Sequence, residues 1–543
     1  MLRSTFLGYK TATSALKVNQ NMLDVVGQNI SNINTEGYTR QRLDINSVSF
    51  NSSNIKLGTT GVIIGQGVKA SGVSQFRDSF LDLRYRMEAA KSGSEYVQLE
   101  ALGDLETVFD EISMNGLDSQ FSDLIEQLHS LTSSPSDPVL EGVVRTSAQM
   151  LTQIFNDYST QIDTIRNQQL NYLEDGAIVK VNQLLDNIAK LNQQIKEDNI
   201  SGNAALELND ERNMLIDELA NYLDIEVELK PEPIGGGRSI DLLSIKLRDT
   251  SPAEYLVNDN KSIELGVVEN GKDVEIFLEK DLLGNDSSKI LTGIIEKGQI
   301  AGYIKFLNGK GEFAIIDDSN AETEVKGVQY YQNMLDKLAN KFAETMNEVN
   351  KAPDLDGDGN YQYDADGKVI LKDQPLFEPR NGAEITAGNI KISDAWASST
   401  DSYITNTKVE TTGDSSGATD NILKMISKFK SKEDFDINVN YDINKDGNTD
   451  DKDKLTLFKG SFQEFLSYTT TRLNLQVDDV QTSYDTYSET QYQIEYARSS
   501  MSSVDLNEEG VNLLQYSKSY NAAARLMTTL DEMLDTLINR MGV

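Results

Sequence analysis

The sequence predicts a mainly α-helical, multidomain protein with an inserted β-rich domain, in a nested architecture whose terminal helices form an α-helical coiled coil. Three observations support this prediction. Apolar residues follow a helical spacing of three and four at both ends of the chain. A cluster of turn-forming residues at 231–239 precedes short, alternating apolar runs. Helical periodicity returns at 328–352 and again from 461 onward. A chain of 543 residues is longer than a single hydrophobic core usually supports, so we expect about three to four domains.

Each end of the chain carries an apolar stripe along one helix face. The N-terminal stripe consists of Leu2, Tyr9, Ala12, Leu16, Leu23, Val26, Ile30 and Ile33. The C-terminal stripe is unbroken and consists of Leu513, Tyr516, Tyr520, Ala523, Met527, Leu530, Leu534, Leu537 and Met541. Such a narrow stripe is typical of a coiled-coil seam and needs a partner helix. Each helix could instead pack on its own globular core, but seams at both ends favour pairing with each other and with neighbouring subunits.

Between the ends, helical patterns extend from about 76 to 228, and β-type patterns follow the cluster PEPIGGGRS. The runs DLLSIKLRD, VEIFLEKD and AGYIKFLNG are read as strands of the inserted domain. The predicted domains, in order, are 1–40 with 505–543 (terminal coiled coil), 41–230 with 326–352 and 459–504 (helical bundle), 231–325 (β-rich insertion), and 353–458 (Asp/Gly-rich, loop-rich insertion).

Composition excludes several function classes. The net charge of −36 repels nucleic-acid phosphates, and no apolar run approaches the ~18 residues that cross a bilayer. The chain has no cysteine and one histidine, His129, in a helical pattern where partial exposure is the expected state. No motif indicates an enzyme. The N-terminus lacks a cleavable leader, so we expect either a cytoplasmic protein or export without leader cleavage.

Two acidic loops are candidate calcium sites. The first resembles an EF-hand-like loop, DxNxDGxxDxxD, with oxygen ligands and a glycine at the spacing that Ca²⁺ requires. Its candidate ligands are Asp442, Asn444, Asp446, Asn448, Asp450 and Asp453. The second loop matches only in its first half, through Asp354, Asp356 and Asp358, and a hairpin or Asx-turn is the stronger interpretation there. No cofactor is required, and calcium remains a hypothesis for both loops.

The N-terminal stripe stops in NISNINTEGYTRQR, where Asn34, Thr35 and Gly37 favour a turn. This stretch, with GYTRQ at Gly37–Gln41, resembles the hook-associated protein 1 family of bacterial flagellar axial proteins. Further resemblance lies in GVKASGVSQFRDSFLDLRYR, NDERNMLIDELANYL, GSFQEFLSYTTTRL and SSVDLNEEGVNLLQYSKSYNAAARLMTTLDEMLDTLIN. It covers about 1–230 and 460–543.

The resemblance implies a structural, non-enzymatic subunit that joins hook to filament by helical self-assembly. It implies secretion through the flagellar type III export apparatus and an extracellular position at the hook–filament junction. The implied partners are other copies of the chain, the hook protein, the second junction protein, and a cytosolic chaperone on the C-terminal helix. The resemblance also implies that the N- and C-terminal helices form the inner tube of the axial structure. Tyr38 and Arg40 are then candidate contacts where the chain leaves that tube. The alternatives are another axial protein (hook or second junction protein), then a calcium-dependent surface adhesin, then an enzyme hidden in 232–458.

Overall fold

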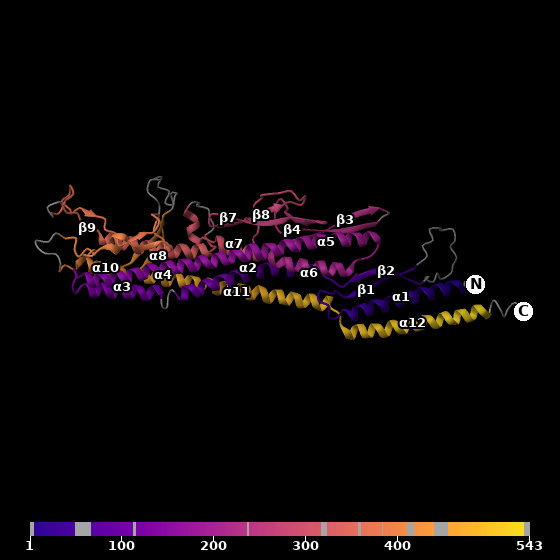
Figure 1. Cartoon of the computed structure of the whole chain (residues 1–543). Helices are drawn as coiled ribbons and strands as arrows, with labels where there is room; N and C mark the ends of the chain where they lie inside the picture. The colour runs from indigo at the N-terminus through magenta and orange to yellow at the C-terminus, as the bar shows by residue number, and fades with distance from the viewer. Residues whose placement is uncertain are drawn as a thin grey trace.

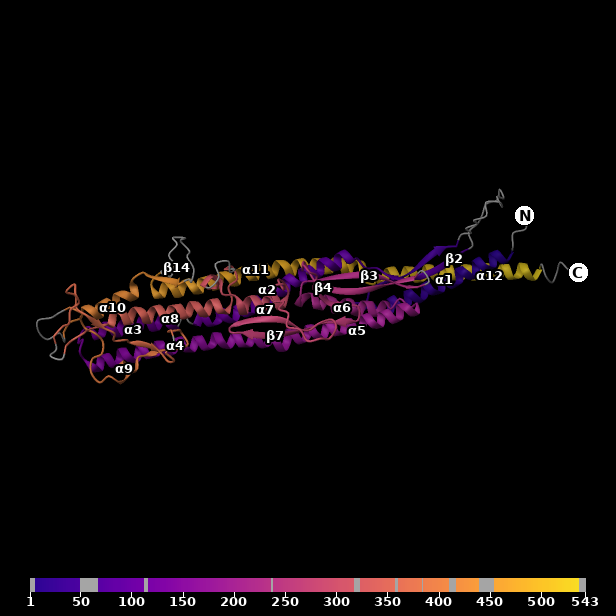
Figure 2. The same cartoon turned by 90° about the horizontal axis from the view of Figure 1, so that it is seen from above.

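The structure is a computed structural model. It describes residues 5–48, 67–111, 116–235, 238–316, 323–356, 360–382, 384–409, 417–438 and 454–536. The described chain is a long rod, mainly helical, with small sheets along one side (Figure 1). Two helices, α1 (Thr5–Ser31) and α12 (Leu506–Asp535), extend from one end of the rod and lie side by side in both views (Figures 1 and 2). They run antiparallel, since Gly8 in α1 faces Leu530 in α12.

Helices form the body of the rod. Apart from α1 and α12 they are α2 (Ser79–Glu111), α3 (Leu117–Leu131), α4 (Pro138–Asn171), the π-helical η3 (Tyr172–Ile178), α5 (Val179–Ser201), α6 (Leu206–Tyr222), α7 (Gln299–Asn308), the 3-10 turn η4 (Gly311–Ile316), α8 (Val328–Asn350), α9 (Asp394–Ser398), α10 (Asp420–Lys430) and α11 (Phe462–Ser502). The stretches predicted to be helical at 76–228, 328–352 and beyond 461 are therefore mainly helical.

The described strands form small antiparallel sheets. They are β1 (Gln41–Ser47), β2 (Val68–Gln75), β3 (Ile225–Gly235), β4 (Arg238–Leu247), β5 (Tyr255–Asn258), β6 (Lys261–Ser262), β7 (Glu264–Asn270), β8 (Asp273–Lys280), β9 (Ala352–Pro353), β10 (Leu371–Lys372), β11 (Phe377–Pro379), β12 (Ile390–Ile392), β13 (Glu433–Asn438) and β14 (Lys454–Gly460). The largest sheet has the order β3-β4-β5-β6, and each other sheet is a two-stranded pair.

The body brings together helices from distant parts of the sequence. α2 and α11 pack along each other in opposite directions. Two contacts show this: Asp82 pairs with Arg498, and the rings of Tyr96 and Tyr484 lie 5.9 Å apart. Phe121 of α3 is fully buried and contacts four other aromatic rings. These rings belong to Phe155 of α4, Phe342 of α8, Phe429 of α10 and Phe462 of α11. One aromatic core thus ties together helices separated by more than 300 positions.

One predicted strand is wrong. The run AGYIKFLNG belongs to helix α7, which buries Ile300, Ile304 and Leu307 on one face. These residues lie at i, i+4 and i+7, so the run fits helical periodicity as well as alternation. The tight packing of α7 on α2 decides the outcome: a Cβ on Gly302 would lie 2.6 Å from the backbone oxygen of Ser94.

The β-rich segment begins before the expected breaker cluster. β3 starts at Ile225 and continues through Pro231 and Pro233, paired with β4 from Ile225↔Leu247 to Gly235↔Arg238. Proline is tolerated there because β3 is the edge strand of its sheet. The last described strand of this region, β8, ends at Lys280, and α7 is the next described helix or strand.

Two features lie outside the sequence predictions. β1 and β2 form a hairpin directly after the terminal helix, with Gln41 opposite Gln75 and Ser47 opposite Val68. Within the loop-rich region, α10 packs Ile422, Met425, Ile426 and Phe429 into the core. Among the described helices, no segment has the length and apolar character needed to cross a bilayer.

Candidate functional site

The site begins where α1 ends, at a turn closed by Asn29. This side chain is 1% exposed, and its oxygen accepts hydrogen bonds from the Gln41 backbone N–H (2.9 Å) and the Tyr38 hydroxyl (2.9 Å). Its amide donates to the Gln41 carbonyl at 2.9 Å. Gly37 has φ of +75°, which glycine adopts without strain. The last turn of α1 therefore fixes the path of the chain into β1.

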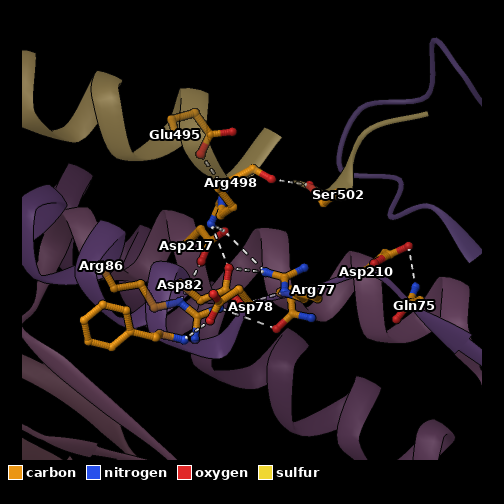
Figure 3. Close-up of polar contacts among 12 residues, drawn as sticks. Gln75, Arg77, Asp78, Asp82, Arg86, Asp210, Asp217, Glu495, Arg498 and Ser502 are labelled. Atoms are coloured by element: carbon orange, nitrogen blue, oxygen red, sulfur yellow. Dashed lines mark hydrogen bonds and ion pairs between the residues drawn. The ribbon is translucent and has the colours of Figure 1, made fainter. Parts of the chain in front are cut away.

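Helix α6 holds the same stretch from the other side. The carboxylate of Asp210 accepts hydrogen bonds from the Thr39 N–H (3.0 Å) and the Gln75 side chain (2.8 Å; Figure 3). The Gln41 amide donates to Glu207 at 3.1 Å. Burial raises the pKa of Asp210, and the bonds from Thr39 oppose that shift. Burial also raises the pKa of Tyr38, so its hydroxyl stays protonated as a donor.

Arg40 connects this stretch to α12. Its two terminal nitrogens each donate to Glu508 at 2.9 Å, and its Nε donates to Glu509 at 2.8 Å. Its backbone N–H donates to the carbonyl of Ser502, the last residue of α11, at 2.8 Å. Glu509 is 1% exposed, so the guanidinium neutralises a buried charge. Arg40 therefore contacts the end of one long helix and the start of the next.

The break between α11 and α12 is built into the sequence. Asp505 caps α12 by accepting from the N–H of Asn507 (2.7 Å) and of Glu508 (3.4 Å). The acidic first turn is also favoured by the positive end of the helix dipole. The chain thus crosses between body and terminal helices twice, at 32–40 and at 503–505, and Arg40 links the two crossings.

Beside these crossings lies an ion cluster that joins three body helices (Figure 3). Asp217 of α6 accepts from Arg86 of α2 (2.6 Å) and from Arg498 of α11 (2.6 Å). Asp82 of α2 pairs with Arg77 at 2.6 Å and with Arg498 at 3.4 Å. These five side chains are largely buried, and charges so placed need their partners. The cluster therefore locks α2, α6 and α11 together at the base of the body.

We name the whole arrangement the terminal joint: the turn and strand start at 29–41, the cap at 502–509, and the ion cluster. Tyr38 and Arg40 were the contacts inferred from the resemblance, and both lie in it. The ion cluster was missed, because its residues lie far apart in sequence and show no motif spacing. Its groups hold α1, β1, α2, α6, α11 and α12 in place relative to one another.

The calcium candidates lie elsewhere. Asp442, Asn444, Asp446, Asn448, Asp450 and Asp453 fall outside the described residues, as does Asp358. Asp354 and Asp356 are described: the N–H of Asp354 donates to Ile370, and the Asp356 carboxylate accepts from the Asn360 N–H at 2.8 Å. Within the described ranges, no group of three or more acidic or histidine side chains is arranged to hold a metal ion. His129 is exposed on α3, as expected.

Comparison with known proteins is consistent with these observations. Residues 102–363 match the family described as "Flagellar hook-associated protein FlgK helical domain". Residues 498–541 match "Flagellar basal body rod FlgEFG protein C-terminal", and residues 10–39 match "Flagella basal body rod protein". The two terminal matches cover most of α1 and α12.

Two relatives match along almost their whole length. Flagellar hook-associated protein 1 of Bacillus subtilis (strain 168) is 29% identical, covering 100% of this chain and 99% of that protein. Flagellar hook-associated protein 1 of Escherichia coli (strain K12) is 23% identical, covering 97% and 98%. The solved flagellar hook junction protein FlgK from Burkholderia pseudomallei is 17% identical, covering 55% of this chain and 46% of that one, with a TM-score of 0.41. Along its whole length the chain is therefore similar to flagellar hook-associated protein 1, and its residues 102–363 match the helical domain described for that protein.

Proposed function

We propose that this flagellar axial subunit joins the hook to the filament by helical self-assembly, with α1 and α12 forming its inner, tube-building part. The observation that carries this proposal is the surface of α12. Of its 30 residues, only Glu509 and Ala523 are buried. Its exposed apolar side chains are Leu506, Val511, Leu513, Leu514, Tyr520, Leu526 and Met533.

A helix with this surface is incomplete in a single copy. α1 covers one side of α12, and the apolar residues on its other sides remain in contact with water. Apolar side chains that gather on an exposed surface mark interaction sites. Full burial of an exposed leucine is worth about 1.5–3 kcal/mol, and these leucines, already partly covered, would contribute part of that value. Neighbouring copies, packed around an axis, would complete a coiled coil that the pair α1–α12 begins.

The domain division that accompanies this proposal places 1–40 with 505–543 in the inner tube. The terminal joint supports it, since Arg40 and Asp505 lie at the two limits. The body would be 41–230 with 326–352 and 459–504, and the insertions 231–325 and 353–458 would face outward. Under this arrangement the terminal joint transmits force between tube and body.

The partners and route follow from the same proposal. The partners are other copies of the chain, the hook protein, the second junction protein and an export chaperone that covers the exposed face of α12 before assembly. The chain would leave the cell through the flagellar type III export apparatus and reside outside it. The charge of −36 repels nucleic-acid phosphates, so nucleic acid is not among the proposed partners.

The test replaces apolar surface that is exposed in the single copy. Leu513→Ser with Leu526→Ser should leave the circular dichroism of the purified chain unchanged and yield hooks without filaments, with flagellin lost to the medium. Leu283→Ser is the matched control, since Leu283 is 73% exposed and lies outside the terminal helices. Deletion of the gene should give the same phenotype as the α12 variant. Normal filaments after deletion would overturn the junction role.

A further inference from the structure

One face of α11 is acidic and unpaired. Between Leu473 and Ala497 the helix has five acidic residues and neither lysine nor arginine. Four of them point outward, and none forms an ion pair with a described residue: Asp478, Asp479, Asp485 and Glu489. The helical spacing places them within one arc of the surface. The same arc carries Leu475, Tyr492 and Tyr496, which are 60%, 68% and 71% exposed. We call this surface, from Leu475 to Tyr496, the acidic face.

A hollow of about 880 Å³ opens near the middle of the rod. Its walls carry four lysines, from α2, α7 and the segments around α7: Lys91, Lys297, Lys305 and Lys310. Its apolar lining includes Ile295, Ile304 and Val325. Two acidic side chains, Glu95 and Glu296, also line it. We call it the lysine hollow.

The lysines retain capacity for further carboxylates. Lys91 pairs with Glu88 at 2.9 Å, Lys297 with Asp224 at 3.1 Å, and Lys310 with Asp273 at 2.8 Å, but each ammonium has three donors. Lys305 forms no ion pair within the described part of the chain. Burial raises the pKa of Glu95, and the nearby charge of Lys305 opposes that shift. In a chain with 86 acidic and 50 basic residues, the hollow is a local site for an anionic, partly apolar partner.

We propose that the acidic face of one copy docks into the lysine hollow of a neighbouring copy in the assembled flagellum. This inference rests on the proposed self-assembly and specifies its lateral contact. Both surfaces belong to the same chain and differ from each other, so the contact is head-to-tail and repeats around a ring or helix. Tyr487 of α11 lines the hollow and lies within the residue range of the acidic face, so both surfaces stand at one level along the rod. The neighbour is therefore a lateral one.

Cross-linking tests the contact in the full chain, whose lack of cysteine gives a clean background. Thr486→Cys places a thiol on the acidic face, and Ala314→Cys places one at the hollow without removing a lysine. In isolated hook–junction particles, a short bis-maleimide should convert the double variant into a ladder of dimers and higher multimers of this chain. Each single variant is the control and should give no ladder. Particles that contain the double variant but give no ladder, or give only a product with another protein, would overturn the proposal.

Charge reversal tests the electrostatic basis. Lys305→Glu should reduce the yield of the ladder by at least roughly tenfold, as expected for one like-charge contact in an interface. Adding Asp485→Lys in the same chain should restore it, because every copy then carries the reversed pair. Lys190→Glu, an exposed lysine of α5, should leave the yield unchanged. Normal assembly of Lys305→Glu would reject the docking contact alone, whereas normal filaments after gene deletion would reject the junction role.

Discussion

Replacement of Arg40 by alanine removes the side chain that pairs with Glu508 and Glu509 in the first turn of α12. Its partners differ in exposure: the side chain of Glu508 is 58% exposed and that of Glu509 is 1% exposed. Glu508 can return to water, so its pairing contributes at most about 1 kcal/mol. Glu509 is left as a buried, unpaired carboxylate, for which the destabilisation is about 3–5 kcal/mol. The dipole at the start of α12 recovers up to about 1 kcal/mol of this.

The expected net effect is about 3 kcal/mol, or roughly a hundredfold increase in the opening constant of the joint. Amide hydrogen exchange, read on peptides that span 496–509 and 41–47, measures that opening. The exchange rate of Arg40→Lys should lie between those of the unchanged chain and Arg40→Ala, because one ammonium cannot reproduce the five donors of the planar guanidinium. Arg42→Ala is the matched control: its pair with Asp44 is 3.3 Å long and exposed on both sides, so exchange should change by less than about threefold.

A double-mutant cycle separates the two carboxylates. Coupling of Arg40 to Glu509 should exceed its coupling to Glu508 by about 2 kcal/mol. Equal couplings, or an Arg40→Ala variant that exchanges no faster than Arg42→Ala, would show that burial of Glu509 does not make the joint depend on Arg40.

Three further predictions concern the body and the chain ends. Burial raises the pKa of Asp336 to about 6, so protonation of this group stabilises the folded state increasingly as the pH falls from about 7 towards 4. Asp336→Asn should therefore increase the free energy of unfolding at pH 7 by about 1–3 kcal/mol, measured as a higher thermal midpoint. Most of that gain should be lost near pH 4.5. Glu141 is fully buried and accepts from the indole of Trp396 at 2.9 Å, so Glu141→Ala should destabilise by about 3 kcal/mol and shift the emission of this single tryptophan to the red; an unchanged denaturant midpoint would contradict it. In the isolated monomer, amide exchange should be fast across 1 to about 40 and 510–543, and strong protection there would argue against folding on assembly.

The sequence predicted the helical parts well because their apolar residues are periodic over long stretches. The antiparallel partners of those helices could not be found in this way. Arg498 meets Asp82 and Asp217 only once α2, α6 and α11 are packed, and no local pattern encodes that meeting. The same holds for Glu141, whose partner Trp396 lies 255 positions away.

Short apolar runs were the weaker signal. The run around Ile304 satisfies both a strand and a helix pattern, and only its packing on α2 selects the helix. For the terminal joint, turn-forming residues predicted that the helix stops at Asn34 to Gly37, whereas α1 already ends at Ser31. The resemblance singled out Tyr38 and Arg40. What those side chains bind could not be predicted, because Asp210 and Glu509 lie far along the chain.

Both terminal helices leave the rod at the same end, and this arrangement has a practical consequence for engineering. A fluorescent or affinity fusion at either terminus would sit where we propose that copies pack. The excursion between β9 and β10, at the opposite end of the rod, is a better site for foreign sequence (Figure 1). Its turn is held by the Asp364 carboxylate, which accepts from the N–H of Asp366 and of Lys368, both at 2.9 Å. A peptide epitope spliced between Asp366 and Gly367 would be displayed as a tethered loop, far from the assembling surfaces.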